Sequence, residues 1–173
     1  MINLDILVYF NEWMNIYNSG KNNKVILRPG TSQFLQEMKQ IYELIIFANN
    51  SFEYISKILK SFENNEKFFE YILSNNQLNF EKNGSISNLD CLNRDLKNII
   101  ILDKQQSISK LNKDNIIYVK PFYGDVNNDG NILNKLGEIL INIKYDMEEV
   151  DDIRISLIKH KFDIITTITT NLN

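Results

Sequence analysis

Short apolar runs of strand length recur along most of the chain, and amphipathic segments with helical spacing separate them. Each run is bounded by polar, turn-forming residues, as expected for strands that are covered on both faces of a parallel sheet. The predicted strands occupy residues 2–8, 25–27, 44–47, 68–73, 99–102 and 116–119. Strands that alternate with helices predict an α/β domain with helices on both faces of the sheet.

The helical segments carry apolar residues at spacings of three and four. Thr31 and Ser51 are good N-caps for two of these segments. A longer stripe follows the last predicted strand, and a final helix is expected from about residue 149 to residue 161. The threonine-rich end of the chain is ambiguous. We therefore expect one domain over residues 1–163 and a C-terminal tail over residues 164–173.

Residues 77–88 have the pattern of a β-hairpin inserted between two core strands. Two short segments flank Asn83 and Gly84. An Asn-Gly pair suits the type I′ turn that joins two antiparallel strands.

The composition excludes several classes of function but does not identify one. A chain of 173 residues can bury a real core, and its net charge of -3 gives no basic excess for nucleic acid. The single cysteine excludes an intrachain disulfide and a thiolate metal cluster. No apolar run approaches the length of a membrane span, so any membrane contact is expected to use a segment absent from this chain.

Five short motifs follow one another along the chain. They are Trp13 in an Asn-Glu-Trp triplet, Arg28-Pro29-Gly30, and the segments 90–96, 120–124 and 150–154. In this order the chain resembles the CTD-phosphatase-like (FCP1/NIF homology) family of HAD-like domains. Within that family it resembles the degenerate branch of presequence receptors in the mitochondrial inner-membrane translocase. The resemblance covers residues 2 to about 158 and implies a HAD-like three-layer α/β/α fold with a mainly parallel central sheet and an inserted β-hairpin.

The resemblance also implies where a phosphatase site would lie, and most of that site is changed. The family nucleophile, an aspartate at the end of the first strand, corresponds to Asn3, and the proton-donating acid corresponds to Asp5. Ala48 stands where the family has a hydroxyl, and Ser87 stands where it has a phosphate-binding lysine. Asp103 keeps the acid at the end of a later strand. An amide is a much weaker nucleophile than a carboxylate, so we expect no enzyme activity, no metal and no cofactor.

Two of these carboxylates leave alternatives open. Asp5 and Asp103 either cap strand ends or pair with Lys104, or they form the remnant of a magnesium site that supports residual phosphatase activity. A third alternative is a scaffold retained for its fold, with an unrelated partner. Residues 125–130 look like a calcium loop, but Leu136 stands where the loop needs an acid, which favours a helix-entry loop.

By the same resemblance, the domain would face the intermembrane space, bind basic amphipathic presequences and dock the channel subunit. Such a groove needs apolar surface for one face of the peptide and carboxylates for the other. The candidate peptide-binding residues are Leu78, Phe80, Glu66, Glu70 and Glu81. The alternative for Leu78 and Phe80 is an ordinary place in the core.

A docking surface for the channel subunit is implied on the long helical stripe. Its candidate residues are Ile132, Leu133, Leu136 and Leu140. One side of this helix must pack on the sheet, so core packing is the alternative for most of them.

Overall fold

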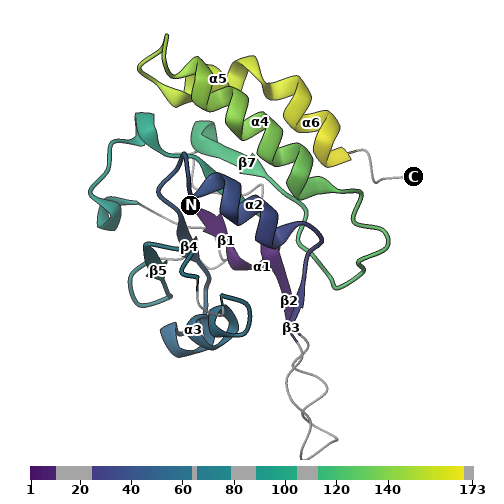
Figure 1. Ribbon diagram of the computed structural model, residues 1–173. Helices are drawn as coiled ribbons and strands as arrows, with labels where there is room; N and C mark the ends of the chain where they lie inside the picture. The colour runs from purple at the N-terminus through teal and green to yellow at the C-terminus, as the bar shows by residue number, and fades with distance from the viewer. Residues whose placement is uncertain (11–24, 64–65, 79–88, 105–112, 170–173) are drawn as a thin grey trace, which may run out of the picture.

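The computed structural model describes residues 1–10, 25–63, 66–78, 89–104 and 113–169, and a parallel sheet lies at its centre (Figure 1). The sheet has the strand order β5-β4-β1-β6-β7, and each strand runs parallel to its neighbours. Its strands are β1 (Ile2–Asn3), β4 (Ile45–Phe47), β5 (Tyr71–Leu73), β6 (Ile101–Asp103) and β7 (Ile116–Tyr118). The prediction of an α/β fold with a parallel central sheet is confirmed.

Successive residues of each strand point to opposite faces of the sheet, and this alternation creates two apolar clusters. Ile46 and Leu102 belong to the larger cluster, together with helices α2 (Thr31–Met38) and α4 (Ile132–Asp146). Their neighbours Phe47 and Ile101 belong to the smaller cluster. That cluster is completed by leucines from irregular segments and 3-10 turns, namely Leu78, Leu89, Leu92 and Leu96.

The first predicted strand is wrong beyond Asn3. The chain leaves the sheet there and forms one helical turn, α1 (Leu4–Leu7), before strand β2 (Val8–Phe10) pairs antiparallel with β3 (Val25–Leu27). The side chain of Asn3 accepts a hydrogen bond from the backbone N–H of Asp5 and caps this turn. A capping amide inside an otherwise apolar run therefore overrides the strand pattern.

Thr31 and Ser51 were predicted as helix N-caps, and the structure confirms only Ser51. Ser51 accepts a hydrogen bond from the N–H of Tyr54 and begins α3 (Phe52–Lys60), as predicted. Helix α2 instead has Gly30 as its N-cap, in a left-handed conformation with φ 81°. Thr31 lies inside the helix, and its hydroxyl donates to the carbonyl oxygen of Arg28.

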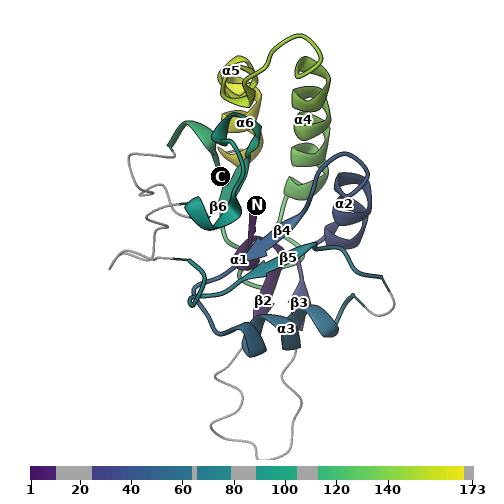
Figure 2. The ribbon, with the colours of Figure 1, turned by 90° about the vertical axis from the view of Figure 1, so that its left-hand side faces the viewer.

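The C-terminal part of the chain forms a helical layer beside α4 (Figures 1 and 2). The predicted helix over 149–161 begins at residue 153, with Asp152 as its N-cap. It is followed closely by another helix, so the layer consists of α5 (Ile153–Lys159) and α6 (Lys161–Thr169). Helix α6 packs on α4 and continues through residues 163 and 164, so the predicted tail is helical up to Thr169. None of the helices in the described ranges is both long and apolar enough to cross a bilayer.

Candidate functional site

Strands β1 and β6 bring Asn3 and Asp103 together at the carboxyl edge of the sheet. The side-chain Nδ2 of Asn3 donates to Oδ1 of Asp103 at 2.8 Å, and both side chains are buried. The same Asp103 oxygen accepts the backbone N–H of Lys104 at 2.7 Å. Because the Asn3 oxygen already caps α1, its amide nitrogen is left facing Asp103. Three of the positions predicted from the sequence, Asn3, Asp5 and Asp103, therefore lie in one place, and Ala48 directly follows β4 at the same edge.

Asp5 lies at the rim of this edge, where it forms an ion pair with the ammonium group of Lys104. The Lys104 side chain is 34% exposed and the Asp5 side chain is 46% exposed. Lys104, which directly follows Asp103 in the sequence, thus provides the positive charge beside Asp5. Among the described residues, no three His, Cys, Asp or Glu side chains gather in a way that could hold a metal ion.

A partly open cavity of about 220 Å³ lies beside this ion pair. Aromatic and aliphatic side chains form most of its wall, with Asp5 and Lys104 as its charged groups. Its lining includes Tyr9, Tyr54, Ile58, Pro121, Phe122 and Tyr123. Tyr123 is 68% exposed, so the cavity opens beside a large ring that already faces solvent.

The Lys120–Gly124 motif forms one wall of this cavity. The backbone N–H of Phe122 donates to the carbonyl oxygen of Asp5 at 2.9 Å, which ties the motif to α1. Gly124 has φ 87°, and a Cβ there would lie 2.7 Å from the ring of Tyr9. The glycine is therefore required both by the backbone conformation and by the close ring.

Arg28 of the Arg-Pro-Gly motif fixes the position of this wall from inside the domain. Its Nε donates to Oδ1 of Asp129 at 2.7 Å, and its Nη1 donates to the carbonyl oxygens of Ile6 and Lys120 at 3.0 and 2.9 Å. The guanidinium also lies over the ring of Phe122, 5.7 Å from its centre. The sequence analysis predicted neither the structural role of Arg28 nor its ion pair with Asp129.

The loop that looks like a calcium site is a helix-entry loop, as favoured from the sequence. Asp129 is committed to Arg28, and Asn131 is the N-cap of α4, with φ 60°. Exposed Asp125 accepts bonds from Asn127 and Asn128 within the loop. The carboxylates of Asp125 and Asp129 thus bind groups of the domain itself.

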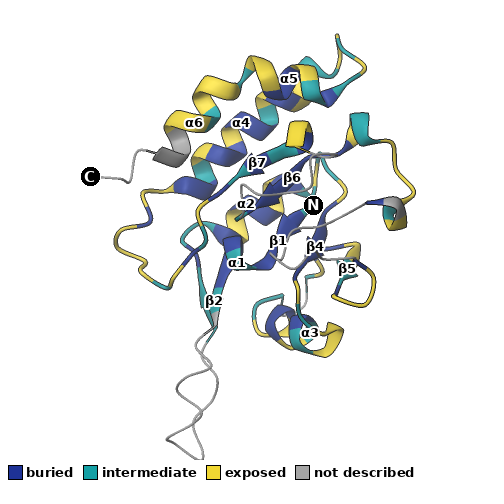
Figure 3. Ribbon diagram, turned by 180° about the vertical axis from the view of Figure 1, so that it is seen from behind, coloured by how far each residue is buried: buried dark blue, intermediate teal, exposed yellow. Residues whose placement is uncertain are grey.

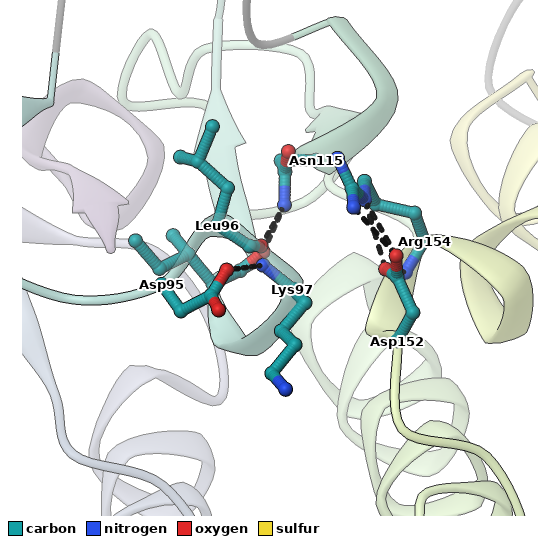
Figure 4. Close-up of polar contacts among 7 residues, drawn as sticks. Asp95, Leu96, Lys97, Asn115, Asp152 and Arg154 are labelled. Carbon is teal, nitrogen blue, oxygen red and sulfur yellow. Dashed lines mark hydrogen bonds and ion pairs between the residues drawn. The ribbon is translucent and has the colours of Figure 1, made fainter.

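The Asp90–Leu96 and Val150–Arg154 motifs meet at the opposite edge of the sheet, where β6 begins (Figure 4). Asp95 accepts a bond from the backbone N–H of Lys97, and Asn115 donates to the carbonyl oxygen of Leu96 at 2.6 Å. Arg154, beside them, binds Asp152 through three hydrogen bonds and lowers the pKa of that carboxyl to about 2. Helix α5 contacts the 3-10 turns Leu96–Asn98 and Lys113–Asn115 at the edge of the sheet opposite Asn3.

The predicted peptide-binding residues do not gather in the described part of the chain. Leu78 is 2% exposed and packs in the smaller apolar cluster, so the core alternative holds for it. Glu66 binds Lys39 and Gln36, while Glu70 is exposed beside Lys67. Phe80 and Glu81, like Ser87 and most of the predicted hairpin, lie outside the described residues.

The predicted docking stripe on α4 is not a surface. Its members are buried in the larger cluster, none of them more than 3% exposed: Ile132, Leu133, Leu136 and Leu140. Helix α4 is covered by α2 on one side and by α5 and α6 on another. A partner could reach these residues only by displacing a helix, so docking through them is corrected to core packing.

The fold, with paired polar side chains at the carboxyl edge of a parallel sheet, defines a phosphatase-like α/β domain. The chain belongs to the NLI interacting factor-like phosphatase family, whose profile matches residues 2–154. It is similar to the mitochondrial import inner membrane translocase subunit TIM50 of Kluyveromyces lactis, with 28% identity over 155 residues that cover 89% of this chain and 30% of the relative. It is also similar to TIM50 of Candida glabrata, with 30% identity over 128 residues that cover 73% of this chain and 25% of the relative.

Solved structures agree with the fold. The RNA polymerase II CTD phosphatase Fcp1 superimposes with a TM-score of 0.53 at 19% identity, over 93% of this chain and 52% of that one. A fission yeast Fcp1 variant bound to beryllium fluoride gives a TM-score of 0.53 at 18% identity, over 99% of this chain and 57% of that one. The chain spans less than a third of the two translocase relatives described above.

Proposed function

We propose that this domain is a non-catalytic receptor domain of a mitochondrial inner-membrane import translocase. In this proposal it faces the intermembrane space, binds presequences and docks the channel subunit. The observation that carries the proposal is the Asn3–Asp103 hydrogen bond at the carboxyl edge, next to the Asp5–Lys104 ion pair. The similarity to TIM50 proteins supports the choice of partner class.

The proposed loss of catalysis follows from the chemistry of these four side chains. Phosphoryl transfer to a carboxylate needs an ionised nucleophile, a protonatable acid and a cation for the phosphate oxygens. Asn3 has no nucleophilic oxyanion, and its nitrogen is engaged by Asp103. Asp5 forms an ion pair with Lys104 at the rim of the edge. These side chains therefore do not favour the phosphatase alternative, although the family and the fold are those of phosphatases.

The cavity beside Asp5 is our candidate place for an apolar side chain of a presequence. Its ring-lined wall suits the apolar face of an amphipathic helix, and exposed Tyr123 extends that wall outward. Asp5 lines this cavity and offers a half-exposed carboxylate to basic residues of the presequence. Exposed Glu70 remains a further candidate for those residues.

The test is a titration of the purified chain with a fluorescent amphipathic presequence peptide at low and at physiological salt. A scrambled peptide of the same composition is the control. We expect saturable binding of the presequence alone, with weaker binding as salt screens its charges. Equal binding of the two peptides would contradict the proposal, and so would magnesium-dependent hydrolysis of a phosphomonoester that disappears in Asp5→Asn.

Tyr123→Ser is expected to weaken presequence binding about tenfold, because exposed aromatic anchors commonly dominate such contacts. The affinity is measured by the same fluorescence titration. The matched control is Tyr145→Ser, since Tyr145 is 65% exposed but lies on α4, away from the cavity. An equal loss of affinity in both variants would show that the cavity is not the binding place.

A further inference from the structure

A second partly open cavity, of about 220 Å³, lies at the amino edge of the sheet, opposite the edge that carries Asn3 and Asp103. It lies beside the starts of β1, β4 and β6, strands that Figure 3 shows as buried. We call it the amino-edge cavity. Its lining residues belong to the described ranges, and none of them also lines the cavity beside Asp5.

Apolar side chains form most of the wall of the amino-edge cavity. Helix α2 contributes Phe34 and Met38, and β6 and α4 contribute Leu102 and Leu140. All four side chains are buried. Tyr42 adds a ring, and its hydroxyl donates to the carbonyl oxygen of Leu140 at 2.7 Å. Burial raises the pKa of this hydroxyl, so Tyr42 is uncharged at neutral pH. These walls therefore offer a ligand apolar contact rather than charge.

An ion pair between Arg94 and Glu43 lies at the opening of the amino-edge cavity. Nη2 and Nε of Arg94 donate to the two carboxylate oxygens of Glu43 at 3.1 and 3.3 Å. The two side chains are 46% and 39% exposed, which places them on the solvent side of the lining. The pair joins the segment that precedes β4 to the Asp90–Leu96 motif, which also contributes Leu92. A motif recognised in the sequence thus forms one side of the cavity.

The volume of the amino-edge cavity restricts its ligand to a small molecule. An apolar protein cavity of about 150 Å³ can bind benzene, whereas sites for larger ligands usually have volumes of about 300–1,000 Å³. At about 220 Å³ the amino-edge cavity has room for one or two fused rings. Phe34 and Tyr42 offer rings and Met38 offers a thioether, and both kinds of group make favourable contacts with an aromatic ring.

The ion pair at the opening disfavours a net charge on the ligand. An anion would be attracted by Arg94 and repelled by Glu43, and a cation would meet the reverse. The cost of removing the ligand's charge from water is then not offset. We propose that the amino-edge cavity binds an uncharged aromatic small molecule of about the size of indole. This proposal does not depend on presequence binding, because the two cavities lie at opposite edges of the sheet.

The test is isothermal titration calorimetry of the purified chain with indole. The matched controls are indole-3-acetate, an anion, and tryptamine, a cation. We expect saturable binding of indole and at least about tenfold weaker binding of both controls, because their charges lose water without compensation. In protein NMR spectra, indole should shift amide signals of residues 43–45 and 98–100 and leave those of residues 122–124 unchanged. No saturable binding of indole, or equal binding of the three compounds, would overturn the proposal.

A filled cavity tests the location of the ligand. Leu92→Phe is expected to weaken indole binding about tenfold or more, since even one methylene changes affinity by that much in an apolar pocket. The matched control is Leu96→Phe, because Leu96 is half-buried in the same apolar cluster but does not line the cavity. Equal indole affinities of the two variants, with native circular dichroism spectra, would contradict the proposed site.

A change at the opening tests the role of the ion pair. Glu43→Gln leaves Arg94 without its counter-charge, so it should strengthen the binding of indole-3-acetate and not that of tryptamine. Stronger binding of tryptamine instead would contradict the proposed selection by charge. Tighter binding of N-acetyltryptophanamide than of indole would assign the cavity to a side chain of a partner protein, and would overturn the proposal of a free ligand.

Discussion

Arg28→Met is expected to lower the free energy of unfolding by about 3–5 kcal/mol, because it leaves a buried carboxylate without its cation. The Arg28 side chain is 1% exposed and that of Asp129 is 5% exposed. Burial lowers the pKa of Arg28 and raises that of Asp129, and the opposite charge of each partner counters the shift. The variant also loses two hydrogen bonds to backbone carbonyls and the contact with the ring of Phe122. Urea unfolding followed by circular dichroism measures the change.

The double variant Arg28→Met with Asp129→Leu is the control for this prediction. A buried ion pair that is replaced by apolar groups of similar volume often loses little stability. We expect the double variant to recover a large part of the loss, although the carbonyls of Ile6 and Lys120 still lose a donor. A loss below about 1 kcal/mol in Arg28→Met would place the pair among ordinary surface ion pairs and contradict its structural role.

Asn3→Asp is expected to destabilise the domain at neutral pH rather than restore a phosphatase. The new carboxylate would face Asp103 where the amide now donates at 2.8 Å, and both positions are buried. Two adjacent carboxylates raise one pKa, and a rise of two to three units corresponds to about 3–4 kcal/mol. An acid whose folded pKa is raised loses stability as pH rises, so the deficit against the unchanged chain should be largest at pH 7 and should shrink towards pH 4. Thermal unfolding of both proteins across this range measures it.

The exchange of the two side chains is the matched control. The double variant Asn3→Asp with Asp103→Asn keeps one amide and one carboxylate at the pair, so it should recover most of the stability at pH 7. Magnesium should also return part of it in Asn3→Asp, since paired carboxylates bind hard cations. No turnover of a phosphomonoester is expected in either variant, because Ala48 still lacks a hydroxyl. Equal deficits for Asn3→Asp at pH 4 and pH 7 would show that the loss is not electrostatic.

The carboxyl edge of the sheet was predictable because its signals are local. Apolar runs that end at Phe47 and just before Asp103 mark strand ends, and parallel strands place such ends at one edge. The place of Asn3 at this edge was implied by the family resemblance instead, because the predicted first strand continued to residue 8. The same logic placed Asp5 and Lys104 near each other, and their pairing was one of the alternatives left open. The turn after Asn3 was not predictable from periodicity, because a two-residue strand and a one-turn helix contain too few residues to display a period.

The remaining errors come from partners that are far apart in sequence. Arg28 and Asp129 are separated by 101 residues, and the sequence around neither residue indicates that the two form a buried pair. The stripe on α4 was open to a docking interpretation because a sheet covers only one side of a helix. The second cover is provided by α5 and α6, and part of α6 comes from the threonine-rich segment whose structure the sequence left ambiguous.

The place of β1 in the sheet has a consequence for the time course of folding. This strand is the middle one of the five, yet it precedes all the others in the chain, and Asn3 meets Asp103 across 100 residues. At a synthesis rate of about 5–20 residues per second, the partner strand β6 appears roughly 5–20 s after β1. The other neighbour of β1, strand β4 (Ile45–Phe47), is made after less than half of that delay, so β1 can pair on one side before β6 exists. The second side of β1, and with it the Asn3–Asp103 contact, is completed late.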